Sequence, residues 1–184
     1  MAHIHDEDID HILLTQQQIA ARIQELGEQI SRDYQGQELL VVGILKGAVV
    51  FYSDLIRQIN LSMRLDFMVV SSYGSSTDSS GVVRILKDLS QDIQGKHVLI
   101  VEDILDTGLT LHYLTEILKH RSPASIEVCT LMDKPERRRA DIHAKYIGFT
   151  IPDAFVVGYG LDYNEKYRNM PSVGVLKEEV YRRG

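Results

Sequence analysis

The chain has 184 residues, the size of one ordinary domain with a single hydrophobic core, so we expect one domain over residues 1–184. Its 20 Lys and Arg against 26 Asp and Glu give a net charge of −6, which argues against electrostatic binding of nucleic acid or of an anionic membrane surface. Cys129 is the only cysteine, so an internal disulfide is excluded and a reducing compartment is favoured. No apolar run reaches the roughly 18 residues of a membrane-spanning helix. The first ten residues carry acids and histidines and do not resemble a secretory signal, so we expect a cytoplasmic protein.

The first half of the sequence alternates between helical and strand patterns. Thr15 is a candidate N-cap for a helix that runs to about Tyr34 and has an apolar face of isoleucines and leucine. The continuous apolar run Leu39–Leu45 is typical of a strand buried on both faces. The following segments are predicted as a helix at Ala48–Ile59, a strand at Leu65–Ser71, a Ser- and Gly-rich loop at Ser71–Gly81, and an antiparallel strand at Val82–Asp88.

The second half continues the alternation. His97–Val101 is predicted as a buried strand that stops at the acids Glu102 and Asp103. A helix over about Thr110–His120 follows, and then four strands at Ser125–Leu131, Tyr146–Phe149, Phe155–Tyr159 and Val173–Leu176. Strands that alternate with helices predict an α/β fold with a mostly parallel, doubly wound sheet.

The strongest break in the apolar pattern is the segment VLIVEDILDTGLT, residues 98–110. Ligands of open α/β sheets gather beyond the carboxyl ends of the strands, where this segment lies. Gly108 permits a close backbone approach, and the helix N-terminus with its neighbouring threonines offers donors for an anion. The acids Glu102, Asp103 and Asp106 would repel a bare phosphate, so they favour a ligand that also carries a diol or arrives with Mg²⁺. A sugar phosphate combines these features.

At these residues the sequence resembles the type I phosphoribosyltransferases, whose binding motif for 5-phosphoribosyl-1-diphosphate (PRPP) has the same order of apolar strand, two acids, Asp, Thr-Gly and Thr. It is most similar to the hypoxanthine-guanine branch of that family, because three further segments match at the right spacing. They are LKGA at Leu45–Ala48, SSYG at Ser71–Gly74, and IPDAFVVGYGLDYNEKYRN at Ile151–Asn169. The resemblance covers the chain from about residue 10 onward, and implies a small hood from the terminal segments and a mobile active-site loop.

The resemblance implies a site for PRPP and its pyrophosphate. A loop at Lys46 and Gly47 would bind pyrophosphate through backbone N–H groups, often with a cis peptide before the lysine, and Arg168 would reach the same group. Glu102 and Asp103 would hold the ribose diol and Mg²⁺, with Asp162 assisting a second Mg²⁺ directly or through water. The phosphate cradle would be formed by Asp106, Thr107, Gly108 and Thr110. Leu109 departs from the polar residue or lysine that many relatives carry between Gly and Thr, which puts in doubt one side-chain contact.

The resemblance also implies a purine site. Lys134 would donate to the exocyclic O6 and so favour a 6-oxopurine such as hypoxanthine or guanine, Phe155 would stack on the base, and the main chain of Val156 and Asp162 would contact its edge. Asp106 would act as general acid/base at N7 while N9 bonds to C1′ of the ribose. Ser72 and Tyr73, in the Ser- and Gly-rich loop, would belong to a lid that excludes water.

The implied activity is Mg²⁺-dependent purine salvage from PRPP, with no nucleic acid or membrane partner and a homodimer or homotetramer as the assembly. Two other interpretations fit parts of the sequence: a PRPP-sensing regulator that binds RNA or DNA, and a Mg²⁺ phosphohydrolase with Asp106 as nucleophile. The first is disfavoured by the net charge of −6, and the second by the purine-pocket residues, which a hydrolase does not need. His3, His5, Asp6 and Asp8 could imitate a metal cluster, but a frayed terminus is the favoured interpretation.

Overall fold

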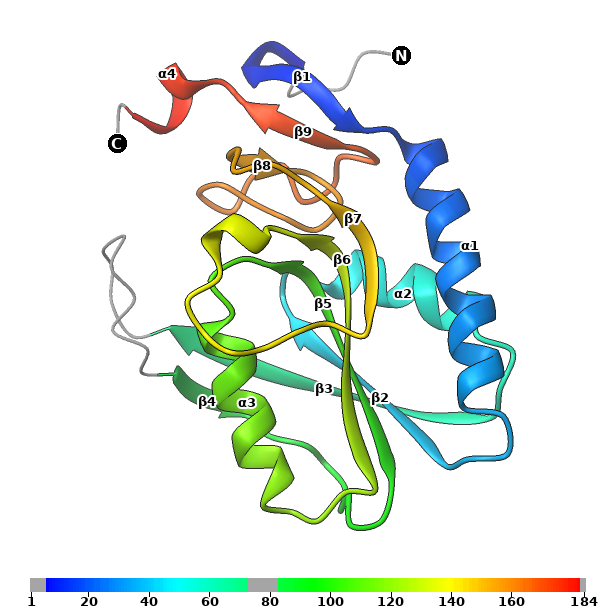
Figure 1. Cartoon of the computed structure of the whole chain (residues 1–184). Coiled ribbons are helices and arrows are strands. Elements are labelled where there is room, and N and C mark those ends of the chain that lie inside the picture. The colour runs from blue at the N-terminus through cyan, green and yellow to red at the C-terminus, as the bar shows by residue number, and fades with distance from the viewer. Residues whose placement is uncertain (1–5, 73–82, 183–184) are drawn as a thin grey trace.

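The computed structural model describes residues 6–72 and 83–182, and its centre is a six-stranded sheet (Figure 1). The strand order is β4-β3-β2-β5-β6-β7. Only the β3–β4 pair is antiparallel, while β2–β3, β2–β5, β5–β6 and β6–β7 are parallel. The strands are β2 (Leu39–Leu45), β3 (Met63–Ser72), β4 (Val83–Lys87), β5 (His97–Leu105), β6 (Ser125–Asp133) and β7 (Tyr146–Thr150). The predicted mostly parallel sheet, including the antiparallel return of β4, is confirmed.

Helices cover both faces of this sheet, because successive residues of its buried strands point to opposite sides. On one side Val41 and Leu99 pack in a cluster with residues of α1 (Gln16–Asp33) and α2 (Val49–Gln58). On the other side Val42 and Ile100 pack with the buried leucines of α3 (Leu109–Lys119). The expected doubly wound α/β arrangement is therefore present.

Helix α1 begins where the sequence indicates. The side chain of Thr15 accepts a hydrogen bond from the backbone N–H of Gln18, and the Gln18 side chain accepts one from the backbone N–H of Thr15, which is a complete capping box. The buried residues of the helix include Ile19, Ile23 and Leu26, spaced as one face of a helix requires. Their burial fixes α1 against the sheet and α2.

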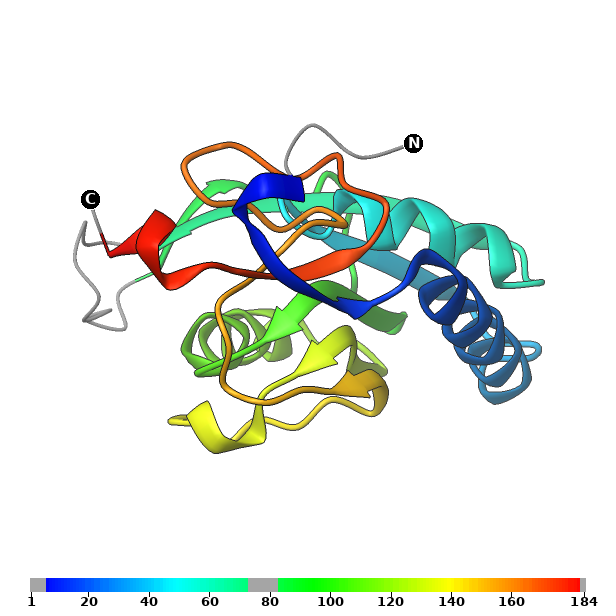
Figure 2. The same cartoon turned by 90° about the horizontal axis from the view of Figure 1, so that it is seen from above.

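A second, three-stranded antiparallel sheet forms a hood at the end of the molecule where β5 and β6 terminate (Figure 1). Its order is β1-β9-β8, with β1 at Ile9–Leu14, β8 at Val156–Val157 and β9 at Val173–Leu176. Figure 2, seen from above, shows β1 beside the C-terminal segment that carries β9 and α4 (Glu178–Tyr181). The short 3-10 helices are η1 (Asp6–Asp8) and η2 (Pro135–Arg137).

The hood corrects the interpretation of the N-terminal segment as frayed, at least from Asp8 onward. Strand β1 was not predicted, yet it pairs with β9 from Ile9 to Leu14. The Asp8 carbonyl accepts a hydrogen bond from the Lys177 backbone N–H at 3.0 Å, and the Asp8 carboxylate accepts one from the Tyr167 hydroxyl at 2.9 Å. These partners lie more than 150 residues along the chain, so no local pattern reveals them. His3 and His5 lie outside the described residues.

Two predicted strand ends were wrong. Strand β5 does not stop at Glu102 but continues to Leu105, because it pairs with β6 as far as Leu105 and Asp133. The segment predicted as a strand from Phe155 to Tyr159 keeps ladder pairing only at Val156 and Val157, and the chain then turns at Gly158, whose φ is +97°. The remaining element boundaries differ from the expected ones by a few residues at most.

Candidate active site

The turn between β5 and α3 has the form expected of an anion cradle. Asp106 and Thr107 follow the strand, and Gly108 stands at the N-cap of α3 with φ +79°, a conformation that favours glycine. A Cβ on Gly108 would lie 2.6 Å from the Ile142 side chain, so space also requires glycine here. Together with the α3 N-terminus, the side chains of Thr107 and Thr110 border a small cavity of about 100 Å³. The expected residues are therefore together at a helix N-terminus that can receive a phosphate.

Glu102 and Asp103 lie near the end of β5, beside the turn that follows β2. The Asp103 carboxylate accepts a hydrogen bond from the Ile104 N–H at 2.7 Å, and its Oδ2 lies where a Cβ on Gly47 would be only 2.0 Å away. Burial raises the pKa of Asp103 to about 6, and burial with the charge of Asp103 raises the pKa of Glu102 well above its usual value. The protein alone therefore disfavours two negative charges at this place, and a bound cation would stabilise them.

The two cations expected at pyrophosphate, Lys46 and Arg168, come from distant segments and meet at one acidic turn. Lys46 follows a cis peptide bond from Leu45, as the resemblance implied, and its Nζ lies 3.1 Å from Glu165 Oε2. Arg168 contacts Asp162 at 2.7 Å and Glu165 at 3.5 Å, and donates to the Gly160 carbonyl at 2.8 Å. Its Nε is buried and has no hydrogen-bond partner among the described residues. A bound anion could replace Asp162 and Glu165 as the partner of both Lys46 and Arg168.

A cavity of about 320 Å³ joins these groups, since its lining includes Gly47, Asp103 and Arg168. A second pocket of about 440 Å³ adjoins it and shares Ile104 and Asp162 with it. The second pocket has Asp106, Lys134 and Phe155 in its wall, so the expected acid/base residue lies between the anion cradle and the expected base site.

Lys134 is buried in that second pocket, with only 7% of its surface exposed. It follows β6 directly, its backbone N–H donates to the Leu105 carbonyl at 3.0 Å, and its Nζ donates to the Ala154 carbonyl at 2.6 Å. Nζ also lies 3.7 Å from Asp153. A buried ammonium with three donors can give one of them to a ligand while the others keep it in place.

Phe155 lines the same pocket and its surface is 38% exposed. It is therefore not a core residue, the alternative that its position at the start of a strand allows. Its ring is stacked on Tyr181 of α4, with centroids 4.7 Å apart and an interplanar angle of 15°, and meets the Tyr163 ring edge-on at 5.6 Å. Val156 is buried next to it and pairs with Val175 of β9. The hood therefore supplies an aromatic wall, of which sequence reasoning found Phe155 and missed Tyr181.

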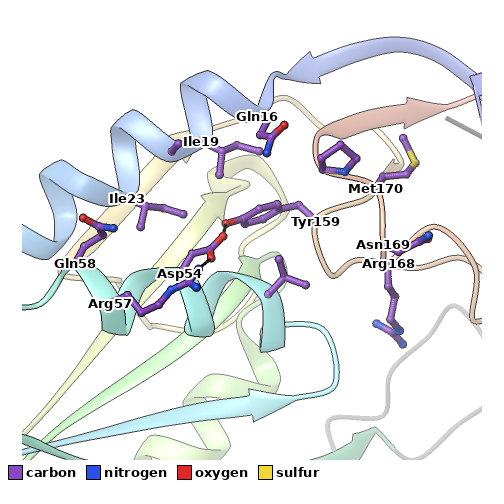
Figure 3. A pocket seen from close by; sticks show the side chains of 13 residues that line it. Gln16, Ile19, Ile23, Asp54, Arg57, Gln58, Tyr159, Arg168, Asn169 and Met170 are labelled. Atoms are coloured by element: carbon purple, nitrogen blue, oxygen red, sulfur yellow. Dashed lines mark hydrogen bonds and ion pairs between the residues drawn. The ribbon is translucent and has the colours of Figure 1, made fainter. Parts of the chain in front are cut away.

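A further cavity of about 430 Å³ lies between α1, α2 and the segment at residues 168–171 (Figure 3). Figure 3 shows Tyr159 pointing toward Asp54 of α2, and the Tyr159 hydroxyl donates to that carboxylate. Arg57 pairs with the same carboxylate. Because α2 follows the Lys46 turn and Tyr159 precedes Arg168, this contact fixes the two cation-bearing segments relative to each other.

The structure thus brings together the residues that the sequence suggested for PRPP, for the purine and for acid/base catalysis, apart from those of the lid. Ser72 ends β3, and Tyr73 lies outside the described residues, so the lid remains an expectation. Leu109 is the first residue of α3. Sequence reasoning missed Arg137, Arg138, Asp153 and Glu165. The run of arginines at residues 137–139, so soon after Lys134, was the signal that could have found two of them.

Comparison with known proteins agrees with this geometry. Residues 11–164 match the phosphoribosyl transferase domain family. The chain is 56% identical to a hypoxanthine-guanine phosphoribosyltransferase of Staphylococcus aureus, with 95% of this chain and 97% of the relative covered. It is 52% identical, over the same shares, to the hypoxanthine-guanine phosphoribosyltransferase of Bacillus subtilis. A crystal structure of a Staphylococcus aureus hypoxanthine phosphoribosyltransferase superposes with a TM-score of 0.95 at 54% identity, covering 98% of both chains.

The fold and the site define a phosphoribosyltransferase, and the chain belongs to that family. Within it, the relatives that match over nearly the whole chain are hypoxanthine-guanine phosphoribosyltransferases.

Proposed function

We propose that this protein transfers the 5-phosphoribosyl group of PRPP to a 6-oxopurine, hypoxanthine or guanine, in purine salvage, and releases pyrophosphate. The observation that carries the proposal is that one pocket holds Lys134, Phe155 and Asp106 and opens beside the anion cradle at Gly108 and Thr110. A base held in this pocket would therefore meet a phosphoribosyl group held next to it. The relatives that match over nearly the whole chain are named for that activity, which supports the same conclusion.

The base is selected by Lys134. A 6-oxopurine offers an acceptor at O6 to the ammonium, whereas a 6-aminopurine places an amino group there and leaves the buried charge without a new partner. Sites built to hydrogen-bond one group reject analogues without it more strongly than apolar pockets do. The ring of Phe155 provides a stacking surface, which favours any base in the pocket. Adenine should therefore be a poor substrate.

The transfer needs a group that takes the proton from N7. Asp106 lines both the base pocket and the anion cradle, which supports it for this role. N9 forms a bond to C1′ of the ribose, while the bond from C1′ to the pyrophosphate oxygen breaks and its electron pair leaves with pyrophosphate. The proton on N7 passes to the Asp106 carboxylate, so the nucleotide leaves with a neutral imidazole ring. Lys46, Arg168 and the backbone around Gly47 receive the departing anion.

Mg²⁺ fits the donor set. Among the described residues no three His, Cys, Asp or Glu side chains gather into a metal cluster. Mg²⁺ prefers one or two carboxylates together with substrate phosphates, and Glu102 and Asp103 form such a pair with raised pKa values. These two acids, with Asp162 for a second ion, would hold the metal, which supplies charge neutralisation of the pyrophosphate.

The test is pyrophosphate release from PRPP and Mg²⁺ with hypoxanthine, guanine, xanthine and adenine in turn. Turnover with adenine equal to that with hypoxanthine would refute the assignment of Lys134. Asp106→Asn should lower turnover by roughly 10² to 10⁴, the usual contribution of a general acid/base, and leave PRPP binding largely intact. Loss of PRPP affinity with near-normal turnover would move the acid/base role to another residue.

The assembly and the compartment are also proposals. We infer a homodimer or homotetramer in the cytoplasm from the family membership. No helix in the described part of the chain is long and apolar enough to cross a membrane. Analytical ultracentrifugation of the purified protein measures the assembly, and a monomer at micromolar concentration would contradict this inference.

A further inference from the structure

Four charged side chains alternate in sign along the wall of the 440 Å³ pocket. Arg137 Nε lies 3.0 Å from Asp106 Oδ1, and Nη1 of the same guanidinium lies 3.5 Å from Asp153 Oδ2. The other oxygen of Asp153 lies 3.7 Å from Lys134 Nζ. The proposed acid/base residue and the proposed O6 donor are therefore the two ends of one connected chain, with Arg137 and Asp153 between them.

Arg137 and its neighbour Arg138 hold the Asp106 turn at two different points. The Arg138 guanidinium donates to the Asp106 carbonyl at 2.9 Å, which fixes the backbone. Arg137 contacts the carboxylate itself, and that contact is the largest cause of the raised pKa of Arg137. The oxygen that accepts this hydrogen bond is Oδ1 of Asp106. A carboxylate held by one oxygen keeps a defined orientation and can offer its other oxygen to a ligand.

The Arg137–Asp106 pair contributes little to the stability of the fold. The two side chains are 43% and 37% exposed, and ion pairs of this exposure typically add no more than about 1 kcal/mol to the free energy of unfolding. The orientation of a reacting group matters far more to rate, since a displacement of about 1 Å can cost roughly 10²-fold. A role for the pair should therefore be visible in turnover and nearly invisible in thermal stability.

We propose that Arg137 is a positioning residue for the transfer: it holds the Asp106 carboxylate so that Oδ2 meets N7 of the bound purine, while Asp153 links that position to Lys134 at O6. The proposal rests on the acid/base role of Asp106 given above. Arg137 belongs to η2, outside both the β5–α3 turn and the pyrophosphate loop. The proposal therefore adds a third segment to those that act on the imidazole side of the base.

Steady-state kinetics of Arg137→Ala, Asp106→Asn and the double variant test the proposal, with hypoxanthine and PRPP each varied. Arg137→Ala should lower kcat by about 10- to 100-fold, with the KM for PRPP within about twofold of the unmodified protein. In the Asp106→Asn background the same substitution should change kcat by less than about twofold, because residues that act through one another are not additive. Arg137→Lys, which keeps the charge without the planar fork, should recover part of the rate.

Arg139→Ala is the matched control, because Arg139 is an exposed arginine two residues further along that does not line the pocket. It should leave kcat unchanged, and all variants should unfold within a few degrees of one another. If Asp106→Asn keeps normal turnover, the proposed function of Asp106 fails first. If Asp106→Asn is slow but the two substitutions are additive, or if Arg137→Ala has normal kcat, the positioning role of Arg137 is overturned.

Discussion

Replacing Gly47 by alanine should damage the site through a single contact. The new Cβ would stand 2.0 Å from Asp103 Oδ2, where ordinary contact begins at 3.4 Å, so the carboxylate must retreat by about 1.4 Å. That movement forces an unfavourable rotamer, at about 0.5 to 1.5 kcal/mol. It also weakens the hydrogen bond from the Ile104 N–H, which is worth about 1.5 to 3 kcal/mol for a charged acceptor. The expected loss of stability is about 2 to 4 kcal/mol.

Thermal unfolding and PRPP kinetics check this together. For a chain of this length the loss corresponds to a fall in Tm of roughly 4 to 16 °C. The decisive comparison is made in an Asp103→Ala background, where the carboxylate is gone. There Gly47→Ala should cost less than about 1 kcal/mol, because neighbouring substitutions that share one contact are not additive. If Gly47→Ala were equally destabilising with and without the carboxylate, the contact with Asp103 would not be its cause.

Three further predictions follow from other parts of the structure. Lys134→Ala should raise the KM for hypoxanthine by about 10- to 100-fold with little change in the KM for PRPP, measured by steady-state kinetics; a change in the KM for PRPP alone would contradict its place at the base. Burial raises the pKa of Asp103 to about 6 in the fold, so protonation of this carboxyl stabilises the ligand-free protein as pH falls. Relative to Asp103→Asn, the protein should gain about 2 kcal/mol between pH 7 and pH 4 in urea unfolding; identical pH profiles of the two proteins would refute this. Thr15→Ala removes the side chain that caps α1 and should lower the free energy of unfolding by about 1 kcal/mol with unchanged kcat, so a fall in kcat would show that α1 acts on the site.

The elements most predictable from the sequence were those with a local cause. The capping box at Thr15 and the apolar spacing of Ile19 and Ile23 depend on residues within one or two helical turns, and the helix begins where they indicate. The buried strand Leu39–Leu45 is a continuous apolar run and was predicted with its observed bounds. Strand β1 could not be found in this way, because its hydrogen-bond partners lie on β9 at the other end of the chain.

The residues of the candidate site also differ in whether neighbouring residues in the sequence could reveal them. The turn at Asp106 and Gly108 carries its chemistry in consecutive residues, and the family resemblance located the distant segments at Lys46, Lys134 and Arg168. Neither source points to Tyr181, whose ring stacks on Phe155 from a separate helix, or to the Arg137 contact with Asp106. Both depend on where η2 and α4 lie in space, which only the packing of the hood and the sheet decides.

The pairing of β1 with β9 has a consequence for the newly made chain. Leu14 pairs with Val173, so β1 leaves the ribosome about 160 residues before its partner strand exists. At a synthesis rate of about 5 to 20 residues per second, β1 spends roughly 10 to 30 s without the strand that accepts and donates its backbone hydrogen bonds. Val156 of β8 waits for the same strand, since it pairs with Val175. The six strands of the larger sheet can assemble before that, but the wall that faces the base includes Tyr181 and is complete only when residues 173–181 have emerged. Until then a nascent chain lacks the hood side of its base pocket.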